Sequence, residues 1–152
     1  MNDIYEKLVR DGRAALVSRP VFKAALGTGS IVILDFASPG PDGVQVIDSY
    51  IRTECAWRLE TPQSVLVASE DDREQLREQI AKLTNRRVMD LIVLYPSLEL
   101  QLSFEEGCRL CVFPVYAASA EYENWCLRTP ERLEFVAGPG RELRVVKPDD
   151  PG

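Results

Sequence analysis

Residues 57–62 read Trp-Arg-Leu-Glu-Thr-Pro and residues 125–130 read Trp-Cys-Leu-Arg-Thr-Pro, so the pattern W-x-L-x-T-P occurs twice, 68 residues apart. The same spacing aligns Phe36 with Phe104 in the sequence. Because the same 68-residue offset aligns the motif and residues that precede it, the chain is interpreted as an internal duplication. Coincidence in a strand-rich chain is the alternative. We therefore predict two tandem pseudo-repeats.

Each proposed repeat begins with a helix and continues with short strands. Asn2 or Asp3 is a suitable N-cap for the first helix, and Ser69 is one for the second. Alternating apolar and polar residues then predict antiparallel strands. These are residues 21–26, 31–36, 44–48, 54–60 and 64–68, followed by 88–95, 98–104, 108–113, 122–128 and 132–137. The expected class is α+β, with each helix packed on its own antiparallel meander of about five strands.

The two repeats, residues 1–68 and 69–140, are expected to form one compact domain over 1–147. No low-complexity linker separates them, so they should pack together. The polar tail, residues 148–152, is expected to be disordered.

Composition disfavours nucleic acid and membranes as partners. The 152 residues are 45% hydrophobic and carry a formal net charge of −6, which repels a phosphate backbone and suits a basic protein. No apolar run is long enough to cross a bilayer. The N-terminus lacks the pattern of a secretory signal, so we expect a cytoplasmic protein with reduced thiols. A homodimer would form easily if a sheet edge were open.

The chain contains no histidine, which removes the commonest general base and metal ligand. Cys108 and Cys111 have CxxC spacing but fall within a predicted strand, where they point to opposite faces. The Gly-rich stretch 27–30 leads into a strand and lacks a lysine, so a turn is favoured over a phosphate loop. We therefore expect no catalytic residue, no cofactor and no metal site.

The motif Glu123-Asn124-Trp125-x-Leu127-x-x-Pro130, followed by Ala-Gly-Pro-Gly at 137–140, resembles a family of small uncharacterised bacterial proteins with an E-N-W-x-L…P…A-G-P-G ending. Members of that family often lie near toxin or defence systems, and some resemble immunity proteins. The resemblance covers mainly residues 86–140 and brings no catalytic residues with it. It implies an interaction or immunity role.

The prediction is a non-enzymatic protein-interaction protein, in its narrower form an immunity protein that neutralises a basic toxin. The candidate partner-binding residues are Glu121, Glu123, Asn124 and Trp125, while core packing is the simpler role for the tryptophan. The alternative is a small-molecule-binding module with its site between the two repeats. An enzyme that uses carboxylates, Tyr or Lys is a third hypothesis.

Overall fold

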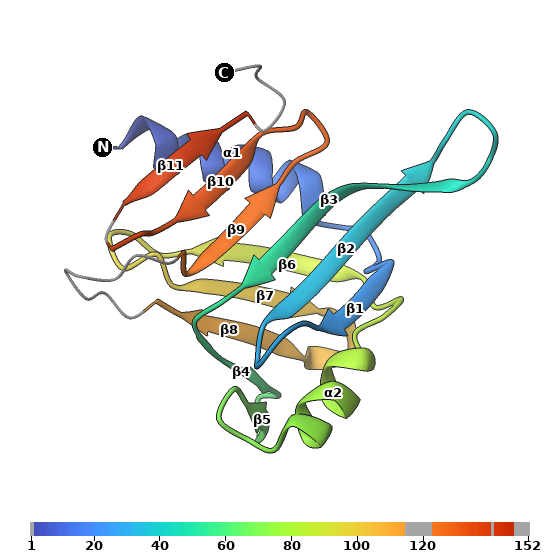
Figure 1. Ribbon diagram of the computed structural model, residues 1–152, viewed down its shortest axis with the longest axis vertical. Helices are drawn as coiled ribbons and strands as arrows, with labels where there is room; N and C mark the ends of the chain where they lie inside the picture. Colours follow the sequence, from blue (N-terminus) through green and yellow to red (C-terminus); the bar gives the residue numbers. More distant parts are fainter. Residues whose placement is uncertain (1, 115–122, 141, 148–152) are drawn as a thin grey trace.

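Two antiparallel sheets and two α-helices make up the described chain, residues 2–114, 123–140 and 142–147 of a computed structural model (Figure 1). The helices are α1 (Asp3–Leu16) and α2 (Arg73–Ala81), and a 3-10 turn, η1, spans Glu105–Gly107. The strands are β1 (Lys23–Leu26), β2 (Val32–Pro39), β3 (Gln45–Thr53), β4 (Ala56–Glu60), β5 (Val65–Ala68), β6 (Val88–Val93), β7 (Leu100–Phe104), β8 (Arg109–Phe113), β9 (Trp125–Arg128), β10 (Glu134–Ala137) and β11 (Leu143–Val146). The α+β class with antiparallel sheets is confirmed, and β11 is a strand that the sequence did not predict.

The strands of each half are divided between the two sheets. The six-stranded sheet has the order β1-β2-β3-β9-β10-β11, and the five-stranded sheet has the order β5-β4-β8-β7-β6. The expectation of one meander for each half is therefore wrong. The two strands that carry the tryptophan motif cross over, so that β4 pairs with β8 and β9 pairs with β3.

Each helix packs against strands of the opposite half, not on a meander of its own. Helix α1 contacts β6 and β11, and α2 contacts β1 and β5. Gly12 permits the close approach of α1, because a Cβ there would lie 3.1 Å from the Leu91 side chain on β6. This packing explains why a helix tolerates a residue that weakens it by about 1 kcal/mol.

Of the two predicted helix N-caps, one is confirmed and the other is wrong. Asn2 caps α1 as predicted, since its Oδ1 accepts the backbone N–H groups of Ile4 and Tyr5. The cap predicted for α2 is wrong, because that helix begins after Asp72. The Ser69 hydroxyl instead accepts the backbone N–H of Trp57 at 3.1 Å.

Both tryptophans of the repeated motif lie in the core between the sheets. Trp57 is 1% exposed and Trp125 is 0% exposed. Each indole N–H donates to a backbone carbonyl, that of Ser30 at 2.6 Å and that of Leu98 at 2.8 Å. Burial with a satisfied donor is what a structural role requires of a tryptophan.

Candidate protein-interaction site

Strands β2 and β3 run on past the body of the molecule as a projecting hairpin, which we call the arm and define as residues 37–47 (Figure 1). The neighbouring β1 pairs with β2 only as far as Asp35, and β9 pairs with β3 only from Tyr50 onward. Beyond those points both edges of the hairpin lie outside the sheet ladder. The arm is therefore a two-stranded extension of the six-stranded sheet.

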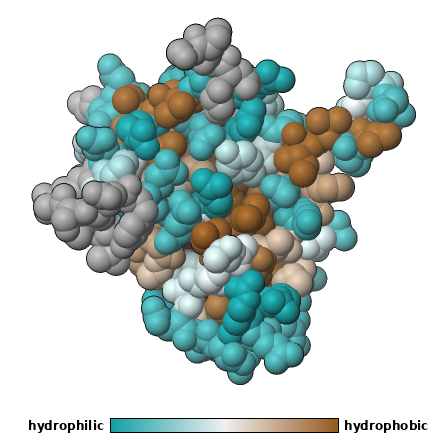
Figure 2. Space-filling view, in the orientation of Figure 1, coloured by the Kyte–Doolittle hydropathy of each residue, from teal (hydrophilic) through white to brown (hydrophobic). Residues whose placement is uncertain are grey.

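The arm displays apolar side chains to solvent. Val44 is 62% exposed, Val46 is 52% exposed and Ile47 is 49% exposed, and Figure 2 shows hydrophobic residues along this projection. No residue of the arm belongs to the buried hydrophobic core. Grouped apolar side chains that contribute nothing to a core indicate a contact surface for another molecule.

A polar network holds the arm at its base. The Arg19 guanidinium donates to the carbonyl of Ala37 at 3.1 Å and pairs with the Asp48 carboxylate at 2.9 Å. That carboxylate also accepts the hydroxyls of Ser38 at 2.6 Å and Ser49 at 2.8 Å. Partial burial opposes ionisation, but these hydrogen bonds and the ion pair outweigh it, and the pKa of Asp48 lies below its ordinary value. A fixed arm loses little conformational entropy on binding.

The residues predicted to contact a partner lie apart from the arm. Glu121 is outside the described residues. Asn124 is 3% exposed and Trp125 is fully buried, so neither side chain offers a surface to a partner in this conformation. The backbone of Asn124 instead joins the sheet, with its N–H donating to the carbonyl of Ala137 at 2.7 Å. Their role in binding stays a prediction that this burial disfavours.

Glu123 lies on the outer face of the six-stranded sheet, where its side chain is 32% exposed. Arg52 approaches it at 3.8 Å and Arg144 at 3.4 Å. On the same sheet the Tyr50 hydroxyl donates to the Glu134 carboxylate at 2.8 Å. Because two arginines already balance the charge of Glu123, this carboxylate is less available to a basic partner than the sequence suggested.

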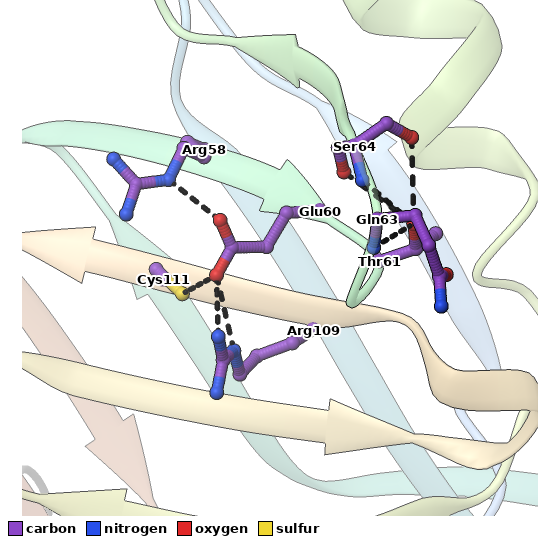
Figure 3. Close-up of polar contacts among 7 residues, drawn as sticks. All are labelled: Arg58, Glu60, Thr61, Gln63, Ser64, Arg109 and Cys111. Atoms are coloured by element: carbon purple, nitrogen blue, oxygen red, sulfur yellow. Dashed lines mark hydrogen bonds and ion pairs between the residues drawn. The ribbon is translucent and has the colours of Figure 1, made fainter.

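A second charged cluster lies on the outer face of the five-stranded sheet (Figure 3). The Glu60 carboxylate on β4 accepts Arg109 at 2.6 Å and Arg58 at 2.9 Å, and the Cys111 thiol lies 3.4 Å away. Hydrogen bonding from Arg109 is the main reason that the pKa of Glu60 is lowered. These contacts join side chains of the paired strands β4 and β8. Charged side-chain pairs across neighbouring strands stabilise the pairing, so the cluster has a structural role.

The cysteines have the environment of buried thiols. Cys108 lies in the core and the Cys111 thiol faces Glu60 on the outer side, so the prediction that they point to opposite faces is confirmed. Burial raises the pKa of Cys55 and of Cys126 to about 12. Such thiols are protonated near neutral pH and are poor nucleophiles. Within the described ranges no group of three or more acidic or cysteine side chains is arranged to hold a metal ion.

Pockets in the described part of the chain include two that bear on small-molecule binding. One of about 260 Å³ lies at the junction of the two halves of the chain. Its lining consists of Ser30, Glu54, Cys55, Ala56, Ser69, Glu70 and Asn124. The other has a volume of about 500 Å³ and a mainly apolar lining around Tyr95, Pro96 and Leu98.

The fold and site define an α+β protein with two antiparallel sheets, each shared by both halves, and a projecting apolar arm. The chain belongs to the family of unknown function DUF6188, which it matches over residues 16–147. No curated protein and no solved structure matches it. In the part of the chain that the structure describes, neither helix has the length and apolar character needed to cross a membrane.

Proposed function

We propose that this chain is a non-enzymatic protein-interaction protein and that the arm is its principal contact surface. The observation that carries the proposal is the exposure of Val44, Val46 and Ile47 on a hairpin that the Arg19 network holds in place. Such side chains lower solubility unless another molecule covers them. A rigid apolar projection suits insertion into a partner surface.

The narrower form of the proposal is a bacterial immunity protein that masks a basic toxin. It is supported by the formal net charge of −6 and by the resemblance carried by residues 123–140. A negative field would speed the encounter with a basic protein, and the arm would then supply the apolar contact that slows dissociation.

We also propose that the fold arose by duplication. The strand order β1-β2-β3-β9-β10 in one sheet corresponds to β6-β7-β8-β4-β5 in the other when the two halves are exchanged. Both indole hydrogen bonds span 27 residues, from Trp57 to Ser30 and from Trp125 to Leu98. Because β7 and β8 have five residues each whereas β2 and β3 have eight and nine, the arm is an addition to the common plan. An addition that builds no core favours a role in binding.

Val46→Asp is expected to abolish capture of a stoichiometric partner from lysate of the native host. The substitution places a carboxylate in an apolar contact, which weakens a central contact by about 2 kcal/mol or more. The measurement is affinity capture with the tagged full chain, followed by quantitative mass spectrometry of the bound proteins.

Val65→Asp is the matched control, because Val65 is 56% exposed on β5, away from the arm. It should capture the same protein as the wild type. Equal loss with both variants, or full capture by Val46→Asp, would contradict the assignment of the arm. A captured basic protein whose toxicity the chain suppresses would support the immunity form.

The alternative function, binding of a small molecule, rests on the pocket between the two halves. Ala56 lines this pocket and is exposed, so Ala56→Trp should fill it while leaving the core intact. A metabolite that raises the Tm of the wild type and not of Ala56→Trp would support this function, since a ligand at 100 times its Kd stabilises by about 2.7 kcal/mol. The same shift in both proteins would exclude the pocket as the site.

A further inference from the structure

The pocket between the two halves of the chain is built from both of them. Ala56 and Asn124 line it, and each directly precedes a tryptophan of the repeated motif. The backbone N–H of Glu54 donates to the Asn124 carbonyl at 2.7 Å, which joins the end of β3 to the residue before β9. Binding sites for small molecules occur preferentially where two structural units meet, and the volume of about 260 Å³ suits a compact ligand.

Hydrogen bonds to Trp57 hold two walls of this pocket in place. The Ser30 carbonyl accepts the Trp57 indole N–H at 2.6 Å. The Ser69 hydroxyl accepts the Trp57 backbone N–H at 3.1 Å, and the Ser69 N–H donates to the Trp57 carbonyl at 2.8 Å. Because Trp57 is itself buried, these walls are ordered before any ligand enters, and little conformational entropy is lost on binding.

Asn124 brings to the pocket a polar side chain that the fold buries without using. The residue is 3% exposed, and no described residue forms a hydrogen bond with its side-chain amide. Close packing fixes the amide, since a Cβ at Gly138 would lie 3.1 Å from its Nδ2. Buried amides normally have hydrogen-bond partners, because burying an unpaired one is unfavourable. A protein surface cannot reach so enclosed a group, but a small molecule in the pocket can supply the partner.

The charged groups that line the pocket are carboxylates. Glu54 and Glu70 are both exposed there, and in the described part of the chain neither forms an ion pair. Arg52 attracts Glu54 from beyond ion-pair distance, and the Arg73 guanidinium donates to backbone carbonyls. No lysine or arginine is among the described residues of the lining. The pocket is therefore polar and negatively charged, which favours a cation.

We propose that this pocket binds a small organic cation, one that carries a guanidinium or primary ammonium group. The carboxylates of Glu54 and Glu70 pair with its charge, and the Asn124 side-chain oxygen accepts one of its N–H groups. A metal ion is disfavoured, because in the described ranges no three acidic or cysteine side chains are placed to hold one. The inference rests on the alternative function, small-molecule binding, and names the class of ligand.

Isothermal titration calorimetry with the full chain tests the charge of the ligand. Butylguanidinium and butylurea have nearly the same shape, but only the first carries a positive charge. Butylguanidinium should bind the wild type at least about tenfold more tightly, the difference that one charge-assisted hydrogen bond makes. Equal affinity for the two compounds, or binding of neither, would overturn the proposal.

Glu70→Gln removes one carboxylate from the pocket and keeps the volume of the side chain. It should weaken the binding of butylguanidinium by about fivefold, the effect of an ion pair that is open to solvent. Glu78→Gln is the matched control, because it removes the same charge from an exposed position of α2 that does not line the pocket. Equal weakening by both variants would show a response to the overall field of the protein and would overturn the site.

Cys55 reports where the ligand lies, since it lines the pocket and is partly exposed, whereas Cys108, Cys111 and Cys126 are buried. Burial raises the pKa of Cys55 to about 12, so alkylation is measured at alkaline pH, where a guanidinium stays charged. Butylguanidinium should slow the reaction of Cys55 with iodoacetamide, followed by peptide mass mapping, and butylurea should not. Binding that leaves this rate unchanged would place the ligand elsewhere and contradict the proposal.

Two further outcomes separate this inference from the proposed functions. If a neutral or anionic metabolite stabilises the wild type and not Ala56→Trp, while butylguanidinium does not bind, the pocket keeps its function and the cation is wrong. Capture of a host protein by the arm should be unaffected by Glu70→Gln. Loss of that capture would mean that the carboxylate meets a basic side chain of the partner, which would overturn a free cation as the occupant.

Discussion

Trp125→Ala is expected to lower the free energy of unfolding by about 3–5 kcal/mol, the range for deleting a fully buried tryptophan. Trp125 is 0% exposed between the two sheets, and its indole N–H donates to the Leu98 carbonyl at 2.8 Å. The truncation leaves a cavity where both halves meet and a buried carbonyl without its donor. Urea unfolding followed by far-UV circular dichroism measures the change.

Two further variants serve as comparisons, one for the indole hydrogen bond of Trp125 and one for an exposed side chain. Trp125→Phe keeps much of the aromatic packing and removes the N–H donor, so its effect should be smaller, about 1–3 kcal/mol. Val65→Ala changes a side chain that is 56% exposed and should stay within about 0.5 kcal/mol of the wild type. An unfolding midpoint for Trp125→Ala that matches the wild type would contradict the stabilising role that we infer for this tryptophan.

Local pattern was sufficient for several elements of the fold. Asn2 caps the helix through its own side chain, whose oxygen accepts backbone N–H groups two and three residues later. The alternation of Leu100, Leu102 and Phe104 with polar residues marks β7 because each side chain points to one face or the other. In these cases the deciding interaction lies within a few residues of the chain.

The pairing of strands could not be predicted, because alternation specifies which face of a strand is buried and not which strand lies beside it. The tryptophan strand β4 would satisfy its apolar face in either sheet, and only the packed structure places it beside β8. The same limit explains the false cap at Ser69. The Ser69 hydroxyl accepts the backbone N–H of Trp57, twelve residues earlier in the chain, and the helix begins later, at Arg73.

The contact residues that the sequence suggested and the arm lie in different parts of the chain. Trp125 and Asn124 drew attention because they are conspicuous in sequence, yet the structure uses them in the core and in the sheet ladder. The arm was expected to be a loop between strands ending at 36 and starting at 44. Ser38 and Val46 pair across the hairpin and extend both strands, although β2 there contains a proline. The usable signal was the close grouping of Val44, Val46 and Ile47 without a matching polar face.

Arg19→Met is expected to lower the free energy of unfolding by about 2–3 kcal/mol. The side chains of Arg19 and Asp48 are 22% and 25% exposed, so the ion pair is partly buried. Exposed ion pairs stabilise a protein by less than about 1 kcal/mol, whereas removing one partner of a fully buried pair costs about 3–5 kcal/mol. The expected loss lies between these two values. Because the pKa of Asp48 is lowered, its contribution is present above pH 3.8 and is lost as the pH falls through the folded-state value. The variant should therefore lose less stability on acidification than the wild type.

Hydrogen exchange shows whether Arg19 acts on the arm or on the whole molecule. If the guanidinium holds the base of the hairpin, amides of residues 37–47 in Arg19→Met should exchange faster by more than the loss of global stability explains, because the arm opens without the core. Arg10→Met is the control, since the Arg10 side chain is 70% exposed and forms an ion pair with Asp11 of the same helix. Equal acceleration throughout the chain would mean that Arg19 stabilises the core and not the arm. Selective acceleration would show that the arm is fixed before any partner binds, and the same variant should then bind that partner more weakly because the arm must be ordered on contact.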